Sequence, residues 1–347
     1  MAGAYCRSQR LSRMESSYDF AIFGGGPLAA LLAGLLAHEH GRQVMLVADP
    51  VSSQRLPRSV ELALPLATRP QSWHLLHRGV AETAALFRAL RAERTLDRVS
   101  AQVIADLPDT RAAVAHLTRT AAGYGLDARK GIHHGVPRLA GAVDLGGSRV
   151  ARIDRDLVEL RVAPDGETRL IVSGEPATIG RIVLTEDADL PDLLPDSLRP
   201  ASLVTQPMTA TLTAPTRRLP APVMLYPDRG VTLVQRPELS VLALVSGDTD
   251  IDARLASTLP GPFPLRRLAS SRFRRVVSAD GAPLIGSLAP SPMLLVAGLG
   301  STGAFLAPAI ARFLAGSAPD DEAAWFAAHD PAHPGRAGIA EPVAGLA

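Results

Sequence analysis

Lysine and cysteine are almost absent from this chain of 347 residues, and each absence excludes a class of function. Lys130 is the only lysine among 36 basic residues, so the Gly-Lys-Ser/Thr loop of nucleoside triphosphatases is missing. Cys6 is the only cysteine, which excludes disulfide frameworks, cysteine zinc sites and iron–sulfur clusters. His74 and His77 share a predicted helix face but lack a third ligand, so we predict no metal site. One cysteine is compatible with a reducing compartment, and we expect a cytoplasmic protein.

Charge of one sign and long uninterrupted apolar runs are also lacking. The formal net charge is +2, with no basic block, so we predict no nucleic-acid partner. Residues 20–37 and 293–311 carry no charge, but glycine clusters interrupt both runs. Such clusters break a helix, so we predict a strand and then a helix in each run, and no membrane span. We expect residues 1–17 to form a disordered leader.

The first glycine loop, Gly24 to Ala29, lies between a predicted buried strand and a predicted helix. Gly24 allows a tight turn, Gly26 lets the backbone approach a pyrophosphate, and the small Ala29 lets strand and helix pack closely. The helix begins near Pro27, so its free N–H groups and positive dipole end face the loop. A second strand ends at Asp49, where a carboxylate can bind an adenosine ribose. This β-α-β unit predicts a dinucleotide site.

The second glycine loop, Gly298 to Gly303, has the spacing Gly-x-Gly-x-x-Gly between a predicted strand and a predicted helix. No strand that could carry a ribose-binding acid follows it, so it cannot open a complete dinucleotide unit. Its helix can still direct an N-terminus at another part of the same long cofactor. Between the two ends, short strands from about residue 149 to residue 277 predict an antiparallel middle. The fold class is therefore α/β with a second, mainly antiparallel β domain.

The C-terminal pattern is the more specific one. The segments Arg275–Gly286, Val296–Gly298 and Gly303–Pro308 resemble, in order and spacing, the closing pattern of the D-amino-acid oxidase family of FAD-dependent oxidoreductases. That family includes glycine oxidase and sarcosine oxidase. The first glycine loop together with Asp49 is similar to the family's FAD fingerprint. The clear matches cover the two ends of the chain, and the middle matches only in general layout.

The resemblance implies a Rossmann-like FAD-binding domain formed by both chain ends and a substrate domain formed by the middle. The first domain would comprise residues 18–110, 140–190 and 290–330, and the second residues 111–139 and 191–289. FAD would bind in an extended form, with the second glycine loop beside the pyrimidine edge of the flavin. The implied cofactor-binding residues are Gly24, Gly26, Pro27, Ala29, Asp49, Val150, Gly298, Gly300, Ser301, Thr302 and Gly303.

The resemblance also implies a substrate site. Arg275 lines up with an arginine that holds the substrate carboxylate in glycine oxidase-like members, and a guanidinium binds a planar carboxylate through two parallel bonds. Tyr226 and Arg236 lie on middle strands where the family places further substrate contacts. The implied function is oxidation of an amine or amino acid, by hydride transfer to the flavin and later hydrolysis of the imine. The electron acceptor would be oxygen or another compound.

Two departures from the family pattern keep an alternative open. Family members have an Ala-Gly pair after the strand that ends at Leu184, whereas this chain has Thr185, Glu186 and Asp187. Ser301 stands at the place of a second carboxylate-binding arginine. Both departures favour a catalytically weak FAD-binding partner subunit that serves assembly or electron transfer.

Overall fold

The computed structural model describes residues 17–49, 56–123, 128–129, 131–140, 149–163, 165–185, 190–247, 251–259 and 266–333. Within these ranges the strands form three sheets, of six, eight and three strands. Residues 1–16 of the expected leader lie outside the described residues, as do Glu186 and Asp187. No helix in the described ranges is long and apolar enough to cross a membrane.

The six-stranded sheet is built from both chain ends. Its order is β16-β17-β10-β1-β2-β6, and all neighbours are parallel except β16 and β17. The central strands are apolar and buried on both faces, as parallel strands covered by other layers must be. Its strands are β1 (Tyr18–Phe23), β2 (Val44–Ala48), β6 (Val150–Asp154), β10 (Ile179–Leu184), β16 (Leu284–Ser287) and β17 (Met293–Ala297).

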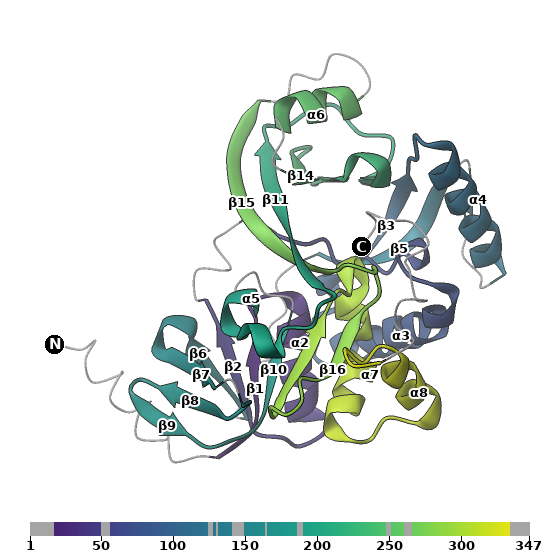
Figure 1. Cartoon of the computed structure of the whole chain (residues 1–347). Helices are drawn as coiled ribbons and strands as arrows, with labels where there is room; N and C mark the ends of the chain where they lie inside the picture. The colour runs from purple at the N-terminus through teal and green to yellow at the C-terminus, as the bar shows by residue number, and fades with distance from the viewer. Residues whose placement is uncertain are drawn as a thin grey trace.

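Helices and a small sheet cover the two faces of the six-stranded sheet (Figure 1). One face carries α2 (Pro27–His38), α3 (Trp73–Ala89), α7 (Gly303–Ala315) and α8 (Asp320–Ala328). The other face carries the three-stranded antiparallel sheet and α5 (Leu190–Leu193). The small sheet consists of β7 (Val158–Val162), β8 (Thr168–Val172) and β9 (Glu175–Ala177). This three-layer unit matches the α/β part of the predicted fold class.

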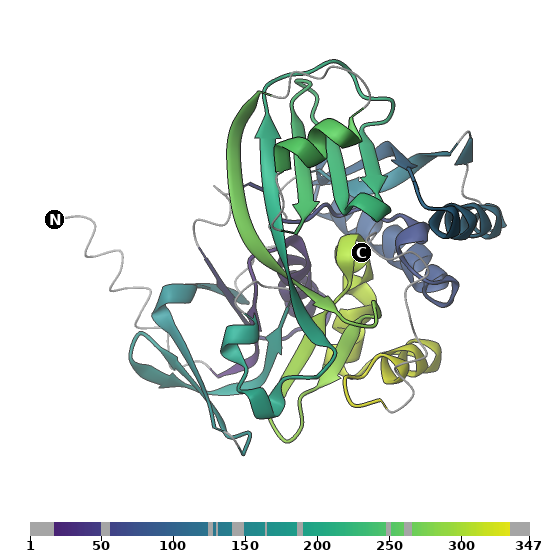
Figure 2. The same cartoon turned by 45° about the horizontal axis from the view of Figure 1, so that its top comes forward.

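The eight-stranded sheet forms the second unit, and its two faces pack against different helices. One face packs against α4 (Pro108–Ala122) and residues 62–67, and the other packs against α6 (Ile251–Thr258). The long strands β11 and β15 run from this sheet towards the six-stranded sheet (Figures 1 and 2). In order, its strands are β15 (Arg267–Ser278), β11 (Leu203–Thr213), β14 (Val241–Ser246), β13 (Val231–Gln235), β12 (Val223–Tyr226), β3 (Leu96–Val103), β5 (Ile132–Leu139) and β4 (Ala128–Arg129).

Two strands lie in a different sheet from the one that our predicted boundaries implied. β3 belongs to the eight-stranded sheet, although residues 18–110 were assigned to the FAD-binding domain. β16 belongs to the six-stranded sheet, although residues 191–289 were assigned to the substrate domain.

Short 3-10 turns connect the elements: η2 (Pro65–Ala67), η3 (Pro70–Ser72), η4 (Glu93–Thr95), η5 (Arg155–Leu157), η6 (Asp196–Leu198), η7 (Pro227–Arg229) and η8 (Gly300–Thr302).

Candidate functional site

The two glycine loops lie at the same edge of the six-stranded sheet. β1 leads into α2 and β17 leads through η8 into α7, and both strands are parallel to β10, which lies between them. The two helices pack against each other on one face of the sheet. Both helix N-termini therefore meet at the carboxyl ends of parallel strands, the usual ligand-binding edge of an open α/β sheet.

The first glycine loop leaves the start of α2 open. Gly26 is the N-cap of α2, no side chain caps it, and the first turn of the helix contains no acidic residue. A Cβ built on Gly26 would meet no atom within 4 Å. The packing of the protein itself therefore does not require glycine at this position, and the space beside it at the helix N-terminus is open. This open cradle fits a pyrophosphate.

Asp49 directly follows the last residue of β2 and is half-buried. It lies at the same sheet edge as Gly24, whose N–H donates to the carbonyl oxygen of Val47 at 3.0 Å. The parallel register pairs Val150 with Val44, at the other end of β2. The structure thus separates Val150 from the first glycine loop, and Asp154, which pairs with Ala48, lies beside the end of β2 instead.

Thr185, the first residue of the departure from the family pattern, lies directly beside Gly24. Its backbone N–H and its hydroxyl both donate to the carbonyl oxygen of Phe23, at 3.0 and 2.7 Å. A Cβ built on Gly24 would lie 2.0 Å from Thr185 Oγ1, and Gly24 has a φ of +151°. The threonine hydroxyl is buried and satisfied, so it fills space next to the loop without leaving a polar atom unpaired.

The second glycine loop turns through left-handed backbone. Gly298 and Gly300 have φ values of +72° and +55°, which favour glycine. Thr302 closes the turn through its backbone N–H and its hydroxyl, which both donate to the carbonyl oxygen of Leu299. Ser301 Oγ is buried and has no hydrogen-bond partner among the described residues. A buried hydroxyl without a partner at a helix N-terminus fits a site that a polar ligand completes.

Glu61 is a site residue that sequence reasoning missed. Its carboxylate accepts a hydrogen bond from Ser59 Oγ at 2.7 Å and another from the backbone N–H of Ala304 at 3.4 Å. Burial raises the pKa of Glu61 to about 7, against the opposing effects of these hydrogen bonds and of the positive charge on Arg275. The available signal was a single acid within the apolar run of residues 60–67.

Arg275 lies on the face of the eight-stranded sheet that is turned towards residues 62–67. It pairs with Gln206 on β11, two residues from Phe273, which packs into the core on that face. Among the described residues the side chain of Arg275 forms no hydrogen bond or ion pair, although its charge acts on Glu61. The guanidinium of Arg58 lies 5.5 Å from the centre of the Phe273 ring. A guanidinium without a bound acid beside a buried carboxylate is a suitable partner for a carboxylate ligand.

The structure does not bring Tyr226 and Arg236 together with Arg275. The Tyr226 ring is buried on the opposite face of the sheet, against α6, and its hydroxyl lies 3.9 Å from Met224 Sδ. Burial raises the pKa of this phenol. Arg236 lies in the turn between β13 and β14, which is at the opposite end of β11 from Gln206. The geometry therefore supports Arg275 alone among the three predicted substrate residues.

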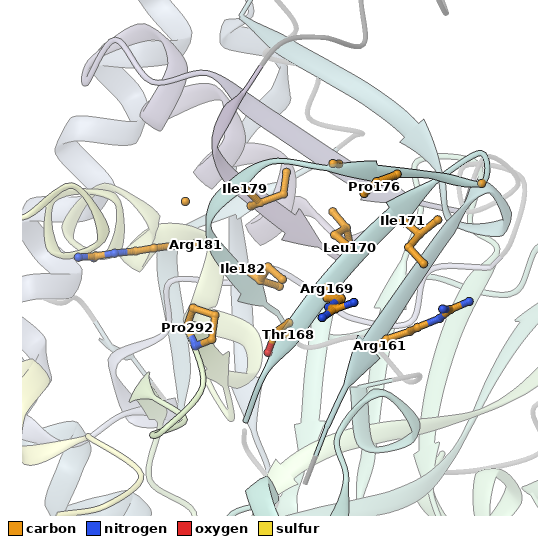
Figure 3. A pocket seen from close by; sticks show the side chains of 13 residues that line it. Arg161, Thr168, Arg169, Leu170, Ile171, Pro176, Ile179, Arg181, Ile182 and Pro292 are labelled. Atoms are coloured by element: carbon orange, nitrogen blue, oxygen red, sulfur yellow. The ribbon is translucent and has the colours of Figure 1, made fainter. Parts of the chain in front are cut away.

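A surface pocket of about 330 Å³ lies between the three-stranded sheet and β10 (Figure 3). Its apolar lining includes Leu170, Ile171 and Ile179, and the side chain of Arg181 extends away from them. Neither glycine loop contributes to its lining. It is separate from the candidate site.

No protein-family model matches the sequence, and a search of curated proteins finds no match. Solved structures do match. The structure of glycine oxidase from Geobacillus kaustophilus superimposes with a TM-score of 0.65 and 16% identity, over 87% of this chain and 95% of that one. The chain has the fold of glycine oxidase.

Two further structures support the same fold. L-proline dehydrogenase from P. horikoshii has a TM-score of 0.69 and 13% identity, over 94% of this chain and 99% of that one. Iminodiacetate oxidase from Chelativorans sp. BNC1 has a TM-score of 0.60 and 20% identity, over 86% of this chain and 96% of that one. The fold expected from the resemblance to D-amino-acid oxidase-type proteins is thereby confirmed.

Proposed function

We propose that this chain binds FAD and oxidises an amine or amino acid. The observation that carries the proposal is the pair of helix N-termini, of α2 and α7, at one edge of a parallel sheet in a glycine oxidase fold. The first N-terminus is open at Gly26, and the second has the Ser301 hydroxyl, which has no hydrogen-bond partner in the described part of the chain. Two such ends suit a long cofactor whose pyrophosphate and reactive ring lie far apart.

The residues of each loop would hold a different part of FAD. The N–H groups at the start of α2 bind the pyrophosphate across Gly26, and Asp49 accepts hydrogen bonds from the adenosine ribose. Gly298, Gly300 and Gly303 would let the second loop approach the flavin, and Ser301, Thr302 and the start of α7 would hold its pyrimidine edge. The placement of Val150 at the opposite end of β2 removes the geometric support for its predicted adenine contact.

Bound FAD supplies the acceptor for a hydride from the carbon that bears the nitrogen. Arg275 holds the substrate carboxylate through two parallel hydrogen bonds and thereby orients that carbon. Phe273 and the neighbouring apolar residues of the same sheet face exclude water from the reacting atoms. The imine product then hydrolyses, and oxygen or another compound accepts the electrons. Three structural neighbours are an iminodiacetate oxidase, a glycine oxidase and an L-proline dehydrogenase, which supports an amine or amino-acid substrate.

One observation favours a second candidate function. Ser301, at the place of a second carboxylate-binding arginine, leaves Arg275 without an arginine partner in the second glycine loop. A substrate site with one guanidinium binds a carboxylate more weakly than a site with two. The alternative is a catalytically weak FAD-binding partner subunit that serves assembly or electron transfer.

The visible spectrum of the purified protein tests the cofactor, and anaerobic addition of amines and amino acids tests the reaction. We expect a flavin spectrum that is bleached by at least one amine or amino acid. A flavin spectrum that no member of a broad panel bleaches would favour the partner-subunit function. A protein that shows no flavin absorbance and gains no thermal stability from added FAD contradicts both.

A further inference from the structure

A buried carboxylate occupies the N-terminal end of α7. The helix has no acidic residue in its own first turn and no side-chain cap, so Glu61, from a distant segment, supplies the negative charge there. Glu61 is 8% exposed. Its pKa of about 7 means that the carboxyl group changes charge near neutral pH.

The backbone on both sides of Glu61 is fixed. The N–H of Leu62 donates to the carbonyl oxygen of Ser301 at 2.7 Å, and the N–H of Leu139 donates to the carbonyl oxygen of Glu61 at 3.1 Å. The segment thus joins the second glycine loop to β5. These two contacts hold the backbone around Glu61 between the second glycine loop and β5.

Few charged groups face Glu61. Arg275 on β15 acts on it and lowers its pKa. Arg138 on β5 forms an ion pair with Asp97 at 3.1 Å, so its charge is compensated. Residues 300–311, which form η8 and most of α7, carry no charged side chain. A new negative charge at the start of α7 therefore acts on Glu61 with little compensation.

The inference rests on the proposed function, which places the pyrimidine edge of the flavin at this helix end. We propose that Glu61 takes up one proton when the flavin is reduced, and so links electron transfer to proton uptake at the start of α7. Reduction by a hydride leaves one negative charge on the ring. Two negative charges that share the same N–H donors repel each other, and protonation of Glu61 removes this repulsion.

The step balances for an ammonium substrate. The nitrogen loses one proton, the neighbouring carbon loses a hydride to the flavin, and a carbon–nitrogen double bond forms. The proton moves to the Glu61 carboxylate, which becomes a neutral carboxylic acid, and the hydride carries both electrons to the flavin. The product is an iminium ion, which water hydrolyses. When the electron acceptor reoxidises the flavin, Glu61 loses its proton.

The test is the reduction potential of the bound flavin as a function of pH, without substrate, for the full chain and for Glu61→Gln. For a two-electron couple each proton taken up adds about 30 mV per pH unit to the slope. We expect one-proton dependence in the wild type below neutral pH, where Glu61 is already protonated. Above neutral pH the slope should double to about 60 mV per pH unit. Glu61→Gln should keep the one-proton slope throughout, because glutamine still accepts the helix N–H but does not titrate.

Two further variants separate proton uptake from a structural role. Ser59→Ala removes a hydrogen bond that favours the charged form of Glu61, so the break in slope should move to higher pH. Glu159→Gln, which alters an exposed acid on β7, should keep the wild-type profile. If Glu61 had only a structural role, Glu61→Gln would not change the slope of the pH profile and Ser59→Ala would not move a break in it.

The outcomes are distinguishable. A break in the wild type that is absent from Glu61→Gln supports proton uptake by Glu61. The same single slope in both proteins, with flavin bound, overturns the proton uptake and leaves FAD binding intact. Failure of the wild type to bind flavin overturns both the proposed function and the inference that rests on it.

Discussion

The hydroxyl of Thr185 occupies the position towards which a side chain on Gly24 would point. A Cβ on Gly24 would lie 2.0 Å from Thr185 Oγ1, while that hydroxyl donates to the carbonyl oxygen of Phe23. The two residues are far apart in sequence but follow neighbouring parallel strands, β1 and β10. The departure from the family's Ala-Gly pair is therefore compatible with the loop, provided that residue 24 is glycine.

Gly24→Ala should destabilise the chain even without a cofactor. The φ of +151° is strained for any residue with a Cβ, at a cost of about 1–3 kcal/mol, and the contact with Thr185 adds to it. Thr185→Ala in the same chain should recover only the part that is due to the contact. The measurement is the free energy of unfolding in urea for the two single variants and the double variant. Full recovery in the double variant would show that the backbone is not strained.

Gly26→Val should have the opposite effects: the apoprotein should keep its normal stability, and the variant should not bind FAD. Gly26 has a φ of −88°, which valine adopts, and its Cβ would meet no atom within 4 Å. The free energy of unfolding of the apoprotein should change by less than about 0.5 kcal/mol. A pyrophosphate on the start of α2 would clash with the side chain, so flavin should be absent after purification.

Asp49→Ala should affect FAD binding less than Gly26→Val does. Loss of a charge-assisted hydrogen bond to the ribose should weaken FAD binding by about 1–3 kcal/mol without abolishing it. Titration of apoprotein with FAD measures the effect. Equal FAD affinity in the wild type and in Asp49→Ala would remove Asp49 from the site.

Local sequence signals predicted much of the fold. The strands β1 and β17 are short apolar runs that are each followed by glycine. α2 and α7 come after them, with proline at N1 of α2 and glycine after α7. In the unit formed by β1, α2 and β2, the elements that pack together are adjacent in sequence. The two glycine loops could be predicted for the same reason.

The remainder depends on pairing between distant segments. β5 contains Gly135 and Pro137, which favour a loop, and it forms a strand because β3 pairs with it through a register shift. Its residue His133 is buried. Glu61 reaches the start of α7 only because Leu62 bonds to Ser301 across the chain. Sequence patterns do not reveal such contacts.

The burial of Glu61 predicts a pH-dependent stability of the apoprotein. Its folded pKa of about 7 exceeds the ordinary glutamate value of 4.5, so the folded state binds the proton more tightly than the unfolded state. The stabilising contribution is complete below pH 4.5 and is lost as the pH rises to about 7. At 1.36 kcal/mol per unit of pKa, the loss is about 3 kcal/mol.

Glu61→Gln should not show this loss. The unfolding free energy of the variant minus that of the wild type should therefore increase by about 3 kcal/mol from pH 4.5 to pH 8. Urea unfolding at several pH values measures the difference, and other titrating groups cancel. Glu159→Gln is the control, because Arg161 holds the pKa of Glu159 below its usual value. A pH-independent difference between Glu61→Gln and wild type would show that folding does not raise the pKa of Glu61.

Arg275 decides between the two functional classes. If it holds a substrate carboxylate, Arg275→Lys replaces a flat two-pronged donor with a point charge and keeps part of the attraction. Arg275→Ala leaves the substrate carboxylate unpaired, and we expect a loss of about 2–5 kcal/mol in transition-state binding. FAD content should be normal in both variants.

The measurement for Arg275 is the rate of anaerobic flavin reduction against substrate concentration. Arg272→Ala is the matched control. Arg272 is exposed and lies on the same strand three residues before Arg275, so its side chain is on the other face of the sheet. Tyr226→Phe is a second control, because the Tyr226 ring lies against α6 and its substitution should leave the rate unchanged. A graded loss, alanine more than lysine with both controls normal, would place Arg275 in an amino-acid site. Equal rates in all variants would exclude it from carboxylate binding and leave amines without a carboxylate as the substrate class.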